Sequence, residues 1–312
     1  MKLSALATAV ALVLTACGGA GVDDAKSSDT AAASDCGSYA IAMHAWVGYT
    51  ASAQVITNVA ESLGCTITQT QLDEAGVTYD AMEAGSIDLV VEDWGGGRWK
   101  DWVDRGAVFE LGSDGNVGQI GMYVPAWMAE KYPDITDSAN LNKYADLFKT
   151  AESKGKGAWL EGPPGYTTIG EKMIKANKLN YTAISVGSEQ ALIDAFTKST
   201  EDKTTPVIGY WWTPHYLLAK LKLVRINFPA SDWTDAAAAS GLTDYPQSDL
   251  QKLGSKKLNE STDAFAKLAK NFKWTNDDQN SVAADIDGGM SPKDAAQKWI
   301  DAHADVVASW TK

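Results

Sequence analysis

Short apolar runs alternate with helical patterns in the first third of the chain. Residues 39–43, 66–71 and 87–91 form apolar or alternating runs that predict strands. Between them, residues 51–63 and 78–84 carry apolar side chains at helical spacing, and each segment is followed by a glycine. This β-α-β-α-β order predicts a parallel sheet with right-handed crossovers.

A glycine-rich run at 112–121 interrupts the pattern, and we interpret it as the crossing into a second domain. Beyond it, the spacing predicts a helix over 141–148 and a strand over 156–160. Two further helices follow, one through Met173 and Ile174 and one over 188–196.

The last third of the chain is polar and alanine-rich at first and then helical. We expect a return crossing near the end of 230–250 and helices over 261–272, 275–287 and 291–308, the last beginning at Ser291 before a proline. Two α/β lobes are therefore predicted, one from 37–117 plus 248–312 and the other from 118–247.

An aromatic stretch lies between a predicted strand and a predicted helix. Residues 205–209 form a β-branched run, residues 210–212 are Tyr-Trp-Trp, and His215 follows Pro214, which suits a first helical turn capped by Thr213. Ligands bind at such strand ends in open α/β sheets. The alternative is that these rings are core packing.

Other candidate residues follow predicted strands in the same way. Trp46 and Trp94 each come after a strand of the first lobe, so both are predicted at one carboxyl edge of the sheet. Tyr166 and Thr167 follow the 156–160 strand, where free backbone amides at a helix start can hold an anion. An ordinary capped loop is the alternative.

Composition excludes several classes of function. The 312 residues carry a net charge of −13, which argues against nucleic-acid binding, and twelve tryptophans suggest aromatic ligand contacts. The chain has three histidines, no G-x-S-x-G motif and no Cys/His spacing typical of a metal site. We therefore expect neither an enzyme nor a bound metal or cofactor.

The N-terminus reads as a targeting segment. After Met1 and Lys2, an apolar run over 3–14 is too short to span a bilayer, and residues 14–17 resemble a lipobox, the bacterial lipoprotein cleavage motif. This resemblance implies a signal peptide over 1–16, a diacylated Cys17 on the extracytoplasmic face of the cell membrane, and a tether over 17–35. A signal peptide with a chance cysteine is the alternative.

Cys36 and Cys65 precede the first two predicted strands. If these strands are parallel neighbours, their starts are adjacent and a disulfide is feasible. Two free buried thiols are the other possibility.

Taken together, several motifs in one order resemble the glycine betaine, choline and carnitine substrate-binding proteins of ABC importers. The resemblance covers residues 38–310. It rests on Trp46, Gly85-Ser86-Ile87-Asp88, Glu92-Asp93-Trp94, Pro164-Gly165-Tyr166, Trp212-Thr213-Pro214-His215, Asp294-Ala295-Ala296 and Trp299-Ile300.

The resemblance implies a type II-like, two-lobed periplasmic-binding-protein fold with two hinge crossings and the ligand between the lobes. It also implies a monomer that delivers its ligand to an ABC permease with its ATPase. By position, the candidate walls of an aromatic cage for a trimethylammonium group are Trp46, Trp94, Tyr123, Tyr166 and Trp212.

Such a cage suits a quaternary ammonium, which has no N–H to donate but is attracted by the faces of aromatic rings. Choline binders that resemble this chain place an acid at the position of Gly48, so the glycine favours glycine betaine, whose carboxylate Thr167 and His215 would hold. Choline, carnitine and proline betaine remain candidates. A sugar- or polyamine-binding lipoprotein is the alternative, supported by the acids at 92 and 93.

The lipobox yields the first testable prediction. Replacing Cys17 by Ala removes the thiol that would be acylated, so the protein is expected to leave the membrane fraction for the soluble one, as measured by fractionation and immunoblotting. Retention in the membrane fraction would count against lipidation.

Overall fold

The structure is a computed structural model that describes residues 36–95, 97–230 and 240–312. The predicted signal peptide, Cys17 and the tether lie outside these ranges. Among the described helices, none combines the length and apolar character needed to cross a membrane.

The first strand begins two residues after Cys36. The strands are β1 (Ser38–Met43), β2 (Thr66–Gln71), β3 (Leu89–Asp93), β4 (Val108–Pro125), β5 (Gly157–Glu161), β6 (Tyr181–Ser185), β7 (Gly209–Thr213), β8 (Leu223–Arg225) and β9 (Gln247–Ser255).

The helices connect these strands and form most of the C-terminal region. They are α1 (Val47–Ser62), α2 (Gly76–Glu83), α3 (Lys100–Asp104), α4 (Ala126–Lys131), α5 (Gly170–Ala176), α6 (Glu189–Asp202), α7 (Leu218–Leu221), α9 (Lys256–Glu260), α10 (Ala264–Asn271), α11 (Asn276–Asp287), α12 (Pro292–Ala302) and α13 (Ala304–Trp310). Three 3₁₀ helices, η1 (Pro133–Thr136), η2 (Ser138–Lys143) and η3 (Ala145–Phe148), lie between α4 and β5.

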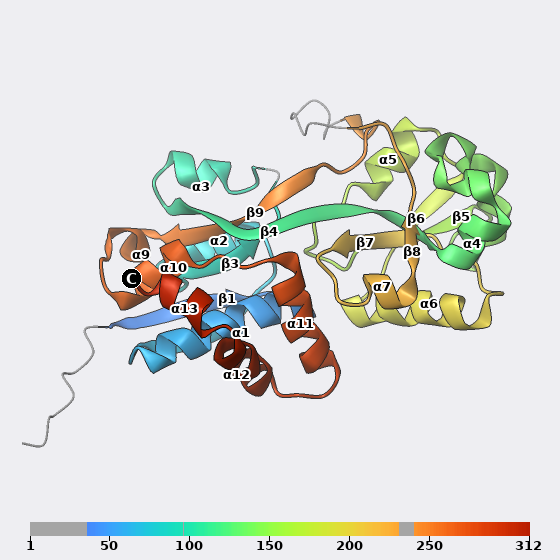
Figure 1. The fold of residues 1–312 in the computed structure, drawn as a ribbon. Helices are drawn as coiled ribbons and strands as arrows, with labels where there is room; N and C mark the ends of the chain where they lie inside the picture. Colours follow the sequence, from blue (N-terminus) through green and yellow to red (C-terminus); the bar gives the residue numbers. More distant parts are fainter. Residues whose placement is uncertain (1–35, 96, 231–239) are drawn as a thin grey trace, which may run out of the picture. The chain divides into compact units, whose positions relative to one another are not determined.

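Two groups of parallel strands are joined by long antiparallel ones. Within the described residues the order is β2-β1-β3-β9-β4-β7-β5-β6, with β8 paired to β4. β1 runs parallel to β2 and β3, and β5 runs parallel to β6 and β7. β4 pairs antiparallel with β9 and, further along, with β7, so it connects the two groups (Figure 1).

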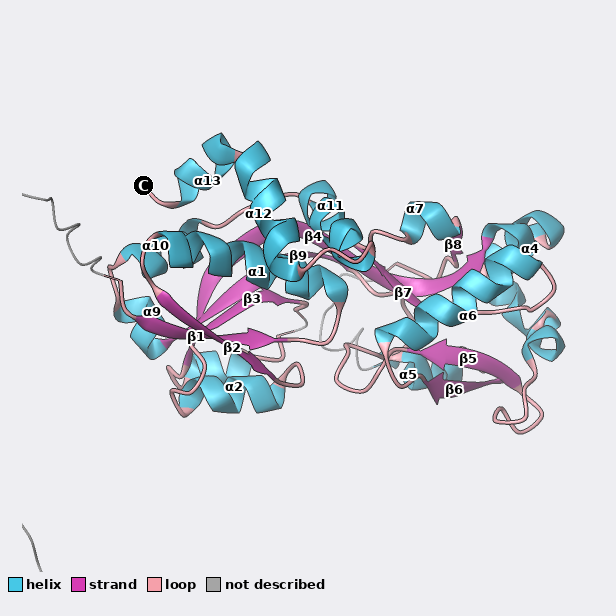
Figure 2. Ribbon diagram, turned by 90° about the horizontal axis from the view of Figure 1, so that it is seen from below, coloured by secondary structure: helices cyan, strands magenta, loops and turns pink. Residues whose placement is uncertain are grey.

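Helices cover both faces of the first strand group. Figure 2 shows α1 and α2 on opposite faces of β1–β3, as right-handed crossovers require for the order β2-β1-β3. α1 is buried on all sides over residues 55–60, between the strands and the helices α11 and α12. The C-terminal helices therefore complete the core of the group in which the chain begins.

The structure confirms most of the predicted elements of the first group. β1 and β2 match the predicted strands, and their parallel pairing aligns Ser38 with Thr66. The predicted start of the 291–308 helix is also confirmed, because the Ser291 side chain caps α12 by accepting from the Asp294 amide. The helix itself breaks at His303, where α13 begins.

The glycine-rich run at 112–121 lies inside β4, the strand that connects the two strand groups. Its bulges and Gly115, with a φ of 93°, carry the strand past Trp274. Two other predicted elements were wrong. The helix expected over 141–148 is a pair of 3₁₀ helices. The strand expected at 205–209 forms instead at 209–213, because pairing with β4 and β5 outweighs the β propensity of the preceding run.

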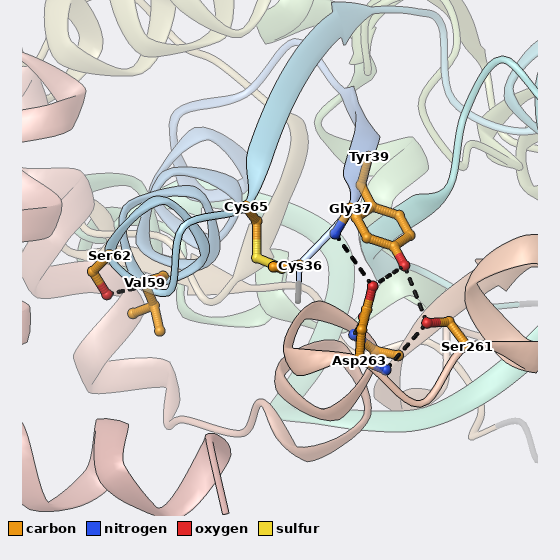
Figure 3. Close-up of a disulfide and its surroundings, with 9 residues drawn as sticks. Cys36, Gly37, Tyr39, Val59, Ser62, Cys65, Ser261 and Asp263 are labelled. Atoms are coloured by element: carbon orange, nitrogen blue, oxygen red, sulfur yellow. Dashed lines mark hydrogen bonds between the residues drawn. A yellow bond between two sulfur atoms is a disulfide. The ribbon is translucent and has the colours of Figure 1, made fainter. Parts of the chain in front are cut away.

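A disulfide and a hydrogen-bonded tyrosine attach the start of the chain to the core. Cys36 and Cys65 are bonded, which confirms the predicted pairing (Figure 3). The Tyr39 hydroxyl donates to Asp263 (2.5 Å) beside Ser261, so β1 is also tied to the start of α10.

The disulfide is expected to stabilise the fold by constraining the unfolded chain. The two cysteines are 29 residues apart, so the Cys36→Ser, Cys65→Ser double variant should lose about 3–4 kcal/mol of unfolding free energy in the chain-entropy model. Urea denaturation would measure this loss. An equal midpoint for the variant and the oxidised protein would contradict it.

Candidate functional site

A small cavity lies where loops and strand ends of the two strand groups meet. Its free volume is about 10 Å³, close to that of a single water site. Its lining is mostly aromatic and consists of Trp46, Glu74, Trp94, Tyr166, Thr167, Tyr210 and Trp212. The first three come from loops at the ends of β1, β2 and β3, and the others come from the β5–α5 loop and β7.

The aromatic side chains form a continuous wall. The Tyr166 ring centroid lies 5.4 Å from that of Trp46 and 5.7 Å from that of Trp212, with both pairs edge to face. Tyr210 and Trp212 point to the same face of β7, with centroids 5.8 Å apart. The arrangement offers several ring faces and few donors to whatever occupies the cavity.

Trp94 completes the wall by packing closely on β4. A Cβ on Gly118 would lie 2.8 Å from Cζ3 of Trp94, so the indole needs glycine at that position. Trp94 is half-buried, whereas Trp46 and Trp212 are 5% and 3% exposed.

Two polar groups face the cavity. The Thr167 hydroxyl oxygen is buried and has no hydrogen-bond partner within the described part of the chain. Glu74 is 8% exposed, and its carboxylate accepts from two Arg98 nitrogens at 2.7 and 3.3 Å. Thr167 is thus available to a ligand, while Glu74 presents a carboxyl group already paired with a cation.

A second carboxyl group lies behind the tryptophans. Glu92 is fully buried, and its Oε1 accepts from Trp94 Nε1 at 2.9 Å and from Trp46 Nε1 at 3.3 Å. Its Oε2 accepts from Ser52 and Gln279. One side chain therefore sets the orientation of two rings of the wall.

Three buried carboxyl groups lie on this side of the cavity. Burial raises the pKa of Glu74 to about 7, an effect that the adjacent Arg98 opposes. Burial also raises the pKa of Glu92 and of Asp93, whose carboxylate accepts from Tyr79 (2.5 Å) and lies 3.7 Å from Arg98. Arg98 thus pairs with two of these three carboxyl groups, Glu74 and Asp93.

Two contacts join the β5–β7 group to the start of α1. The Tyr166 hydroxyl donates to the Ala45 carbonyl (2.9 Å). Glu189, the first residue of α6, accepts from the Val47 amide (3.0 Å) at the first turn of α1, which has no side-chain cap of its own. Both contacts hold the loop of Trp46 against the opposite wall.

The predicted residues divide into two groups. Trp46, Trp94, Tyr166, Thr167 and Trp212 all line the cavity.

Tyr123 and His215 are not among the lining residues. Tyr123 is buried in β4, opposite Gly209. His215 is buried against Trp212, with ring centroids 4.7 Å apart; its Nδ1 accepts from Leu217, and its Nε2 lies 3.3 Å from Glu189.

Two lining residues were missed. Tyr210 precedes Trp212 by two positions, and side-chain alternation would have placed both on one face had the strand been located at 209–213. Glu74 lies in the loop before α2, where no local pattern marks it. No group of three or more His, Cys, Asp and Glu side chains suited to a metal ion occurs among the described residues.

These features define the class of protein. An α/β fold in two lobes, with a small aromatic cavity at the ends of strands, is that of a binding protein for a small molecule. The chain belongs to the OpuAC family, described as the substrate binding domain of ABC-type glycine betaine transport systems, whose family model matches residues 37–302. The family consists of extracytoplasmic substrate-binding proteins, not enzymes.

Known relatives agree with this assignment. The glycine betaine/carnitine transport binding protein GbuC of Listeria monocytogenes is 27% identical over 128 residues, which cover 41% of this chain and only 39% of that protein. The trimethylamine N-oxide-binding protein of Pelagibacter ubique is 26% identical over 284 residues, covering 87% of this chain and 88% of that protein.

A solved structure shows the same fold. Lactococcal OpuAC, in its closed-liganded conformation with glycine betaine, superposes with a TM-score of 0.70 at 20% identity, covering 88% of this chain and 99% of that one. The similarity confirms the predicted two-lobed fold.

A buried carboxyl group lies beneath the loop that carries Tyr166 and Thr167. Glu161 ends β5 at 6% exposure, and its Oε2 has no hydrogen-bond partner within the described residues. Burial raises its pKa to about 7, so the folded state favours the protonated form. The stabilisation is complete below about pH 4.5 and is lost as the pH rises through 7.

Glu161→Gln removes this titration. Relative to the variant, the wild-type protein should lose up to about 3 kcal/mol of unfolding free energy between pH 4.5 and 7.5, as measured by urea denaturation across that range. Glu152→Gln, at an exposed position, should leave the pH profile unchanged. Parallel profiles for wild type and Glu161→Gln would show that the carboxyl does not titrate as expected.

Proposed function

We propose that this protein captures a quaternary ammonium compound in an aromatic cage and delivers it to an ABC permease. The observation that carries the proposal is the convergence of five rings, from Trp46, Trp94, Tyr166, Tyr210 and Trp212, on one small cavity. A trimethylammonium group has no N–H donor, so ring faces recognise it where hydrogen bonds do not.

The free energy of the cation–π contacts is large enough for binding of this kind. A desolvated ring contributes about 1–2 kcal/mol to holding a cation, and a micromolar dissociation constant corresponds to about 8 kcal/mol. Five rings thus supply most of the requirement, and a polar contact with the other end of the ligand supplies the rest.

Glycine betaine is the first candidate ligand. The Thr167 hydroxyl faces the cavity without a hydrogen-bond partner in the described chain and is suited to donate to a ligand carboxylate. His215, which we expected to share this role, supports Trp212 from behind instead. This chain has a glycine at position 48, where the choline binders that resemble it have an acid.

Choline is the second candidate because of Glu74. A carboxyl group in the cavity wall repels a ligand carboxylate but accepts a hydrogen bond from a ligand hydroxyl. Trimethylamine N-oxide, the ligand named for the Pelagibacter relative, is small enough to join the test. Sugars and polyamines have less support, because rings rather than polar groups dominate the lining.

The same proposal includes two lobes that close over the ligand and a lipid anchor on the membrane. Residues 37–117 plus 248–312 form one lobe and 118–247 the other, with crossings near the β4–β9 pairing at Gln119 and Gln247. The lobes close over the ligand. The protein acts as a monomer held on the extracytoplasmic face of the membrane by lipidated Cys17.

Calorimetric titration of residues 36–312 tests the ligand directly. Glycine betaine is expected to bind with micromolar or better affinity, and choline, carnitine, proline betaine and trimethylamine N-oxide are titrated beside it. A preference for choline would assign the polar contact to Glu74. No heat with any quaternary ammonium, but heat with sugars or polyamines, would overturn the proposal.

Removing one ring tests the cage. Trp94→Ala and Trp212→Ala should each weaken binding roughly 5- to 30-fold, the equivalent of about 1–2 kcal/mol per ring. The matched control is Trp102→Ala, whose ring lies outside the cavity on α3. Thermal denaturation establishes that each variant is folded, and unchanged affinity in both folded cage variants would refute the assignment.

A further inference from the structure

We infer that Glu92 is a positioning residue that makes the cavity selective for positive charge. It fixes two indole rings and supplies a buried negative charge directly behind them. This inference rests on the proposed function and adds to it a role for a residue that does not line the cavity.

The geometry of Glu92 is the first argument. The Oε1 atom accepts from both Trp94 Nε1 (2.9 Å) and Trp46 Nε1 (3.3 Å). Both indoles line the cavity, and each directs its N–H edge to the same oxygen. The Glu92 carboxyl group therefore determines which face of each indole is turned toward the cavity.

The neighbours of Glu92 are suited to the ionised form. The two indole N–H groups can only donate. Asn116 donates to Gln279 Oε1 (3.0 Å), which turns the Gln279 amide N–H toward Glu92. Burial raises the pKa of Glu92, and these hydrogen bonds oppose the rise.

The second argument is that Glu92 has no cationic partner among the described residues. Within the described part of the chain, Arg98 forms ion pairs with Glu74 and Asp93, but no ion pair includes Glu92. A buried carboxylate without a cation is costly, and a neutral amide oxygen would satisfy the same indoles at a lower cost. A cation held against the far side of the two rings would complete the charge balance.

The indoles transmit this charge to the ligand. A hydrogen bond from each N–H to a carboxylate draws negative charge toward the ring, and the ring face is what attracts a cation. The carboxylate field also acts directly across the ring in a site of low dielectric. Both effects act on a charged ligand and leave an uncharged ligand of the same shape nearly unaffected.

The test compares each quaternary ammonium ligand with an isostere that lacks its positive charge. Choline is paired with 3,3-dimethylbutan-1-ol, and glycine betaine with 3,3-dimethylbutanoate, in which carbon replaces the ammonium nitrogen. Dissociation constants of the purified wild-type and Glu92→Gln proteins are measured for both pairs. We expect Glu92→Gln to weaken the quaternary ammonium about 10-fold or more and the isostere less than about 3-fold, so that the preference for charge shrinks.

Two further variants separate charge from ring geometry. Glu92→Asp keeps the charge and should keep the preference for the charged ligand within about 3-fold, even if both ligands bind more weakly; this variant also serves as the test if Glu92→Gln does not fold. Glu161→Gln removes a buried carboxyl outside the cavity and should leave the preference unchanged.

The outcomes distinguish this inference from the proposed function. If the wild-type protein binds no quaternary ammonium, the proposed function fails and the inference fails with it. If the wild type binds but Glu92→Gln weakens ligand and isostere equally, or weakens neither, only the inference is overturned. Loss of the charge preference in Glu92→Asp would likewise overturn it.

Discussion

The antiparallel pairing of β4 is the constraint on which the cavity depends. One end of this strand pairs with β9 and the other with β7, so β4 belongs to both strand groups. Within three residues it contacts Trp94, through Gly118, and pairs with Trp212, through Ile120. The two cavity walls are therefore joined through the backbone of a single strand.

The charges near the cavity show that the fold accepts a cost in stability. Glu74, Glu92 and Asp93 are all buried; Arg98 forms ion pairs with Glu74 and Asp93, whereas Glu92 has no ion-pair partner among the described residues. Hydrogen bonds from Trp46, Trp94 and other donors compensate only part of the lost hydration. Such an arrangement is unfavourable for an empty core but favourable for a site that receives a cation.

Under the proposed function, rings and polar groups have separate roles in recognition. The rings would act on a trimethylammonium group and would not discriminate among the other ends of the candidate ligands. Discrimination would fall to Thr167 and Glu74, which differ in whether they favour an acceptor or a donor on the ligand. A family with one fold can thus serve different ligands by changing one or two such residues.

The sequence by itself determined the β-α-β order and the positions of Trp46 and Trp94 after their strands, because local periodicity and strand ends carry this information. It made a Cys36–Cys65 disulfide feasible, and the parallel pairing of β1 with β2 decided it. Only the tertiary structure decided the location of β7, and with it that Tyr210 rather than Tyr123 lines the cavity. It also decided that Glu74 reaches the cavity and that Glu92 joins two indoles. The physical reason is that strand register and contacts between distant residues depend on pairing across the sheet, which a local pattern does not encode.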